Sequence, residues 1–81
     1  MRKILRFTAS WCQPCKGLAM TLAEADLGIP IEVIDIDTND TLAVEYMIRT
    51  VPTLVLLEDE KEIRRMSGTK TVSQLKEWAN D

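Results

Sequence analysis

Hydrophobic and polar positions follow two different spacings along the chain, and these separate strand-like from helix-like segments. Three segments of five or six residues are rich in β-branched and other apolar residues, which is typical of strands, and a fourth, more charged segment follows the last of them after a tight turn. Other segments carry apolar residues three and four positions apart, the spacing of one helix face. The pattern predicts strands over residues 3–8, 31–36, 53–57 and 61–66, and helices over residues 14–27, from 39 or 40 to 46 or 47, and from 71 or 73 onward.

The order of these elements, βαβαββα, predicts an α/β fold. The strand–helix–strand start favours a parallel pair with a right-handed crossover, and the acidic turn at Glu58–Glu60 favours an antiparallel hairpin. We therefore expect a minimal fold in a single domain over residues 1–81, a mixed four-stranded sheet with helices on both faces. Ile31–Ile36 is β-branched on both faces, and we expect it to be buried on both sides. Lys61–Met66 carries charges typical of an edge strand.

Proline and glycine bound the first predicted helix. Pro14 suits its first turn, where a missing N–H leaves no hydrogen bond unmade. Gly28 is expected to stop the helix, and Pro30 prevents its continuation.

Composition narrows the class of protein. Hydrophobic residues make up 46% of the chain and charged residues 28%, which is typical of a globular domain. No apolar run is long enough to cross a membrane, and Arg6 interrupts the apolar residues near the start, so no signal-peptide core forms. The net charge of −3 argues against nucleic acid as a partner. We expect a cytoplasmic monomer that binds neither nucleic acid nor membrane.

The charge is unevenly distributed along the chain. It is +4 over residues 1–16, −7 over residues 17–48 and 0 over residues 49–81. These segments are either solvated faces or, in the first case, a positive surround for two nearby cysteines that would favour their thiolate form.

Cys12 and Cys15 are the two cysteines of the chain. A disulfide between residues so close closes a short loop and removes little entropy from the unfolded chain, so we interpret the pair as reactive and not as a structural link. Cys12 falls at the start of the predicted helix, where free N–H groups and the helix dipole lower the pKa of a thiol. Cys15, one turn further, is placed to resolve a mixed disulfide. We expect no metal and no cofactor, because zinc normally takes four ligands and the chain has no histidine, so that four thiolates would need a dimer.

The string Trp11-Cys12-Gln13-Pro14-Cys15-Lys16 and the later Thr50-Val51-Pro52-Thr53 resemble the thioredoxin superfamily. The resemblance extends from Ile4 to Trp78, and the length is similar to that of glutaredoxins. It implies a thiol–disulfide oxidoreductase, most simply a cytosolic reductant of disulfides in proteins. Cys12 would attack the substrate disulfide and Cys15 would resolve the mixed disulfide, and a thioredoxin reductase-type enzyme or glutathione would reset the pair.

The resemblance also implies a substrate-binding rim. Val51–Pro52 would be a cis peptide facing the disulfide and would offer the backbone of Val51 to an extended substrate. Gly68 would lie on the same rim. Trp11, directly before a cysteine that we expect to be exposed, is interpreted as a contact residue.

Three positions near the cysteines would tune their chemistry. Lys16 is either a solvated helix residue or an electrostatic support for the Cys12 thiolate. Gln13, next to Pro14, stands where thioredoxins most often have glycine. About 30 mV corresponds to 1.4 kcal/mol for a two-electron couple, so a small electrostatic change decides the direction of electron flow.

One position departs from the resemblance. Thioredoxins usually have a buried acidic residue six positions before the first cysteine, where this chain has Arg6. The carboxylate that would relay a proton for Cys15 is therefore missing. Arg6 either stabilises a thiolate, held by Asp35 of the neighbouring strand, or extends to solvent.

Two other functions stay open on the sequence. A glutaredoxin-like, glutathione-dependent redoxin is favoured by the length and by Thr50-Val51-Pro52, whereas Trp11 before the first cysteine favours thioredoxin. The second alternative is a protein of the same fold that serves as a partner subunit, in which the cysteines have no role in the function.

Overall fold

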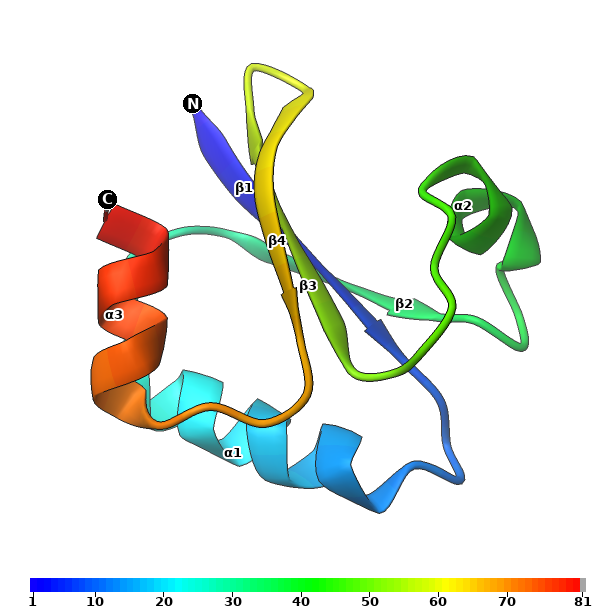
Figure 1. Cartoon of the computed structure of the whole chain (residues 1–81), viewed down its shortest axis with the longest axis horizontal. Helices are drawn as coiled ribbons and strands as arrows, with labels where there is room; N and C mark the ends of the chain where they lie inside the picture. The colour runs from blue at the N-terminus through cyan, green and yellow to red at the C-terminus, as the bar shows by residue number, and fades with distance from the viewer. Residues whose placement is uncertain (81) are drawn as a thin grey trace.

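The computed structural model describes residues 1–80. In chain order its elements are β1 (Arg2–Thr8), α1 (Gln13–Ala25), β2 (Ile31–Asp35), α2 (Asp40–Glu45), β3 (Thr53–Glu58), β4 (Lys61–Ser67) and α3 (Val72–Asn80) (Figure 1). The predicted order is confirmed, and each boundary lies within two residues of its predicted place. Within the described residues, no helix is both long enough and apolar enough to span a membrane.

The strands form one mixed four-stranded sheet in the order β2-β1-β3-β4. β1 pairs in parallel with β2 on one side and antiparallel with β3 on the other, and β3 and β4 form the predicted antiparallel hairpin. The parallel pair, the hairpin and the edge position of β4 are therefore confirmed.

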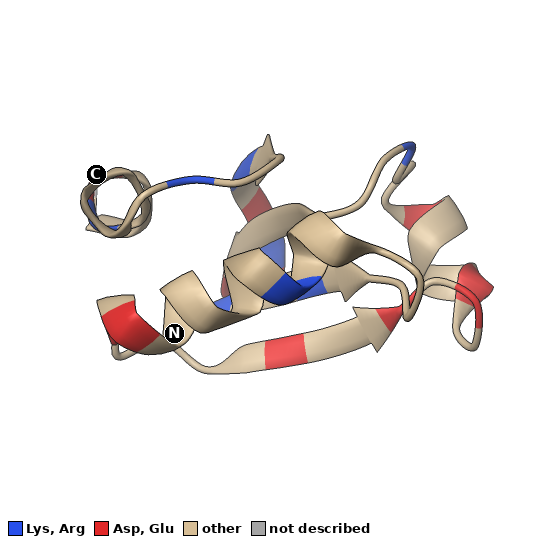
Figure 2. Cartoon of the chain, turned by 90° about the horizontal axis from the view of Figure 1, so that it is seen from below, with Lys and Arg blue, Asp and Glu red and all other residues tan. Residues whose placement is uncertain are grey.

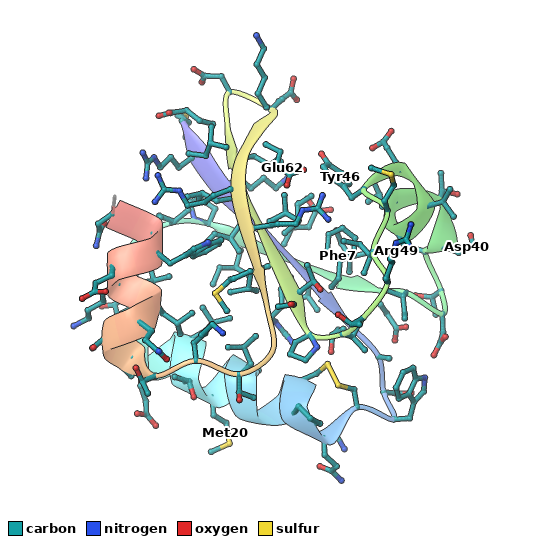
Figure 3. The ribbon with its side chains drawn as sticks, viewed as in Figure 1. Phe7, Met20, Asp40, Tyr46, Arg49 and Glu62 are labelled. Carbon is teal, nitrogen blue, oxygen red and sulfur yellow. A yellow bond between two sulfur atoms is a disulfide. The ribbon has the colours of Figure 1, made fainter. Side chains whose placement is uncertain are left out.

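Helices cover both faces of the sheet, as predicted (Figure 1). The face under α1 and α3 is packed by Ile4, Leu18, Leu22, Ala25, Leu54, Leu56 and Leu75. The opposite face is packed by Leu5, Phe7, Ile34, Val55 and Leu57, against which side chains of α2 and the loop after it lie. The rings of Phe7 and Tyr46 are 5.9 Å apart between their centroids and join that loop to the sheet (Figure 3).

β2 is an edge strand, and the prediction that it is buried on both sides is wrong. Ile31 is 38% exposed and Val33 is 55% exposed. The register pairs Ile31 with Ile4 and Val33 with Arg6, so both face the α1 side of the sheet. The apolar residues of α1 pack on β1 and β3 instead, and that face of β2 stays uncovered. Figure 2 shows Asp and Glu segments along β2 and near α2, toward the margin of the molecule.

α1 ends at Ala25, ahead of the predicted stop at Gly28. Asp26 takes a left-handed conformation with φ of 46°, and its N–H donates to the carbonyl of Leu22 at 3.2 Å. Aspartate is one of the few non-glycine residues that adopt this conformation readily. The helix is therefore capped before the glycine is reached, and Gly28, with φ of +70°, belongs to the following loop.

Candidate active site

A disulfide bond joins Cys12 and Cys15 at the N-terminal end of α1. Cys12 is the N-cap residue, with extended backbone, and its N–H donates to the carbonyl of Ala9 at 3.1 Å. The backbone N–H of Cys15 donates to Cys12 Sγ at 3.2 Å. Pro14 lies in the first turn, where the helix has no use for its missing N–H. The sulfur of Cys12 therefore caps the helix that carries its partner.

Both cysteines are buried in the disulfide form. Cys12 is 4% exposed and Cys15 is 1% exposed. The expectation that Cys12 is exposed is wrong, because Ala9 is buried beside the pair and Ile36 and Val51 pack against them. Figure 3 shows the disulfide between the first turn of α1 and the segment that enters β3.

The segment before β3 contains the predicted cis peptide bond, between Val51 and Pro52. Cys12 Sγ lies 3.8 Å from the carbonyl oxygen of Val51. A disulfide sulfur carries no hydrogen, so in the oxidised form the two atoms are in contact without a hydrogen bond. In the reduced form the thiol of Cys12 can donate to that oxygen. Gly68 donates its N–H to the carbonyl of Pro52 at 3.0 Å and has φ of +81°, a conformation that favours glycine. The structure thus brings Cys12, the cis-proline segment and Gly68 together at one rim.

Trp11 lies next to this rim and is 66% exposed. Its indole Nε1 donates to Asp37 Oδ2 at 3.0 Å. The sequence reasoning missed Asp37, although a signal for it was present. β1 and β2 run parallel, so the residues that follow their C-terminal ends meet at the same edge of the sheet. The parallel pairing of β1 and β2 would have placed a polar residue shortly after β2 close to the segment between β1 and α1.

A cleft of about 220 Å³ lies on the other side of the disulfide. Its lining includes Arg6, Thr8, Cys15, Lys16 and Asp35. Burial lowers the pKa of the Arg6 guanidinium. Among residues 1–80, the ion pairs within 4.0 Å do not include one between Arg6 and Asp35, so Asp35 does not hold Arg6 in the disulfide form.

Two other residues near the cysteines, Gln13 and Lys16, are exposed on the first turn of α1. Within the part of the chain that the structure describes, no three His, Cys, Asp or Glu side chains gather in a group that could hold a metal ion. A disulfide at a helix N-terminus that faces a cis-proline segment is an arrangement suited to thiol–disulfide exchange.

The comparisons with known proteins agree with this site. The family model described as Thioredoxin matches residues 2–81. Thioredoxin H-type 1 of Nicotiana tabacum is 36% identical over 70 residues, which cover 83% of this chain and 56% of that protein. The thioredoxin of Bacillus subtilis is 36% identical over 78 residues, covering 91% of this chain and 75% of that protein. The chain belongs to the thioredoxin family.

Solved structures share the fold. A mutant thioredoxin from Halobacterium salinarum superposes with a TM-score of 0.83 at 34% identity, over 96% of this chain and 71% of that one. The chain spans about half the length of some curated relatives, 56% of the Nicotiana tabacum protein and 50% of thioredoxin C-3 of Corynebacterium nephridii.

Proposed function

We propose that this protein is a thiol–disulfide oxidoreductase that reduces disulfide bonds in protein substrates. The observation that carries the proposal is the Cys12–Cys15 disulfide at the start of α1, 3.8 Å from the backbone of the cis-proline segment. A disulfide closing a loop of this size adds little to stability. The pair is therefore available for exchange without unfolding the protein.

Cys12 is the proposed nucleophile. Its sulfur accepts the N–H of Cys15 at 3.2 Å and lies at the positive end of the α1 dipole, and both interactions favour a thiolate. Lys16 adds a positive charge one residue beyond Cys15, and Gln13 and Pro14 shape the turn between the two sulfurs.

The proposed reaction proceeds in two exchanges. The Cys12 thiolate attacks one sulfur of the substrate disulfide, so a mixed disulfide forms and one substrate thiolate leaves. The Cys15 thiolate then attacks Cys12 Sγ, which releases the second substrate thiolate and closes the Cys12–Cys15 disulfide. Two electrons pass to the substrate, and an external reductant returns the protein to the dithiol.

Substrate binding is assigned to the rim, at Val51, Pro52 and Gly68, and to Trp11 next to it. An extended substrate segment that pairs with the backbone of Val51 would bring its disulfide next to Cys12, because Val51 O and Cys12 Sγ are in contact. Gly68 stands beside Pro52 through its 3.0 Å hydrogen bond.

The proposal includes a cytoplasmic monomer reset by a thioredoxin reductase-type enzyme. A protein that donates electrons must itself be kept as a dithiol, and the cytosol provides that reducing poise. Glutathione as the reductant is the competing outcome of the test below.

Insulin reduction tests the proposed function. The wild-type protein should reduce insulin with NADPH and thioredoxin reductase, and should do so poorly when glutathione and glutathione reductase replace them. Cys15→Ser should accumulate a mixed disulfide with the substrate, and Cys12→Ser should not. A wild-type protein inactive with both reductants would refute the proposal, whereas activity with glutathione alone would move the protein to the glutaredoxin-like function.

A further inference from the structure

Arg6 is a partly buried cation on β1, one of the two central strands of the sheet. Its strand neighbours are Val33 of β2 and Leu54 of β3, so its side chain leaves the sheet on the face that α1 covers. Leu54 is fully buried, and burial lowers the pKa of the Arg6 guanidinium. The other cations of β1 differ in this respect, because Arg2 and Lys3 are paired with Glu58 and Glu32. Within residues 1–80, no hydrogen bond or ion pair neutralises Arg6.

The cleft that Arg6 lines is also lined by Cys15. The other charged groups on its wall are Lys16 from α1 and Asp35 from β2, so cations outnumber carboxylates. One oxygen of Asp35 already accepts the backbone N–H of Asp37 at 2.8 Å. The balance of charge around Cys15 is therefore positive in the disulfide form, when Cys15 itself carries no charge.

Reduction can add a second anion to this cleft, in which the two cations outnumber the carboxylate of Asp35. When the disulfide is reduced, the sulfur of Cys15 becomes a group that can ionise. We propose that Arg6 is a positioning residue that holds Cys15 as a thiolate, so that resolution of the mixed disulfide needs no general base. The proposal rests on the roles assigned to the two cysteines above. A guanidinium has no acceptor and does not lose its proton, so Arg6 acts as a fixed positive charge and donor and not as a base.

Two consequences follow for the chemistry of the pair. The Cys15 proton passes to solvent through the open cleft when the thiol ionises, and the thiolate then attacks Cys12 Sγ without a proton-transfer step. Arg6 also favours the reduced protein over the oxidised one, because only the reduced protein places a negative charge beside it. The dithiol of the wild-type protein is therefore a weaker reductant than it would be with a neutral residue at position 6.

The pKa of Cys15 tests the proposal directly. In Cys12→Ser the remaining thiol can be titrated by its rate of alkylation with iodoacetamide at different pH. The pKa should lie well below the ordinary value of about 8.5 for cysteine, so that the thiol is mostly ionised at neutral pH. Arg6→Gln in that background should raise it by about one unit or more, and Arg6→Lys should keep most of the effect. Asp35→Asn should lower it, because a negative charge is removed. The exposed Arg49→Gln serves as the control and should leave it unchanged.

The reduction potential of the intact dithiol gives a second readout. Equilibration with glutathione at a pH above the Cys15 pKa of both proteins should show that Arg6→Gln favours the disulfide about tenfold more than the wild type, a shift of about 30 mV toward a stronger reductant. An unchanged Cys15 pKa in folded Arg6→Gln overturns the proposal, as does an equal rise in Arg6→Gln and Arg6→Lys. If Arg6→Gln does not fold, the Lys and Asn variants decide: a pKa retained with Lys and lowered by Asp35→Asn supports the proposal, and any other result overturns it. These thiol measurements do not depend on insulin reduction, so failure of the proposed function is seen separately.

Discussion

Gly68 and Gly28 form a matched pair for testing the proposed substrate-binding rim. Both have positive φ, +81° and +70°. Gly68 borders Pro52, whereas Gly28 lies beyond the C-terminal end of α1, at the opposite end of that helix from Cys12. Substitution of either by alanine therefore introduces the same backbone strain at two sites that differ in their relation to the disulfide.

The size of the effect on stability follows from the geometry. A Cβ at either glycine would meet no other atom within 4 Å, so the new methyl group adds no clash. The remaining cost is that of holding an alanine in the left-handed region, about 1–2 kcal/mol. With a urea dependence of about 1 kcal/mol per molar, the unfolding midpoint of each variant should fall by about 1–2 M, with the slope unchanged.

The effect on function should separate the two variants. The methyl group of Gly68→Ala would stand on the rim where a substrate segment is proposed to lie, and the KM for insulin should rise several-fold. Gly28→Ala should keep the wild-type KM at temperatures where it is folded. An equal rise of KM in both variants would show that the rim is not where substrate binds. A Gly68→Ala variant as stable as the wild type would contradict the backbone argument itself.

Two further substitutions test other parts of the fold. Gly17→Ala should stabilise the protein by up to about 1 kcal/mol, because Gly17 lies inside α1 and alanine favours a helix more than glycine does. The new Cβ would meet no atom within 4 Å. A lower urea midpoint than that of the wild type would refute this prediction. Arg65 Nε donates to Glu62 Oε2 at 2.6 Å and holds the pKa of Glu62 below its ordinary value of 4.5. That pair stabilises the protein above the ordinary pKa and ceases to do so as pH falls through the lowered one. Glu62→Gln should therefore lower the free energy of unfolding by about 1 kcal/mol or less at pH 7 and should match the wild type at pH 2. A loss of stability that does not change with pH would contradict a stabilising ion pair between Glu62 and Arg65.

The order and pairing of the elements could be predicted because local signals carry them. The β-branched runs, Pro14 at the helix start and the acidic turn between β3 and β4 each act over a few residues. The edge position of β2 could not be predicted, since it depends on which strands α1 covers. Ile31 and Val33 look like buried strand residues in the sequence, yet they lie where the helix does not reach.

The residues of the candidate site likewise fall into those that local motifs predict and those that depend on the folded structure. Cys12, Cys15 and the cis bond before Pro52 were predicted from motifs that are contiguous in sequence. Asp37 was missed because its hydrogen bond to Trp11 depends on the parallel pairing of β1 with β2. The sequence left Arg6 either held by Asp35 or extended to solvent, and in the structure the two residues line one cleft. That they do not form an ion pair depends on side-chain positions, which strand order alone does not determine.

The loop closed by Cys12 and Cys15 spans a sequence separation of only 3 and lies at the first turn of one helix. In the unfolded chain, such a pair behaves as an ordinary peptide dithiol, because closing so short a loop changes the chain entropy little. Folding and oxidation therefore form a thermodynamic cycle. In this cycle the reduction potential of the cysteine pair in the unfolded chain depends little on the rest of the sequence. Any free energy by which the native structure favours one redox form must reappear as a difference in unfolding free energy between the oxidised and reduced proteins, about 1.4 kcal/mol for each 30 mV. Two urea titrations, one of each form, thus measure how far the fold has moved the potential of its cysteines, without any redox partner in the cuvette.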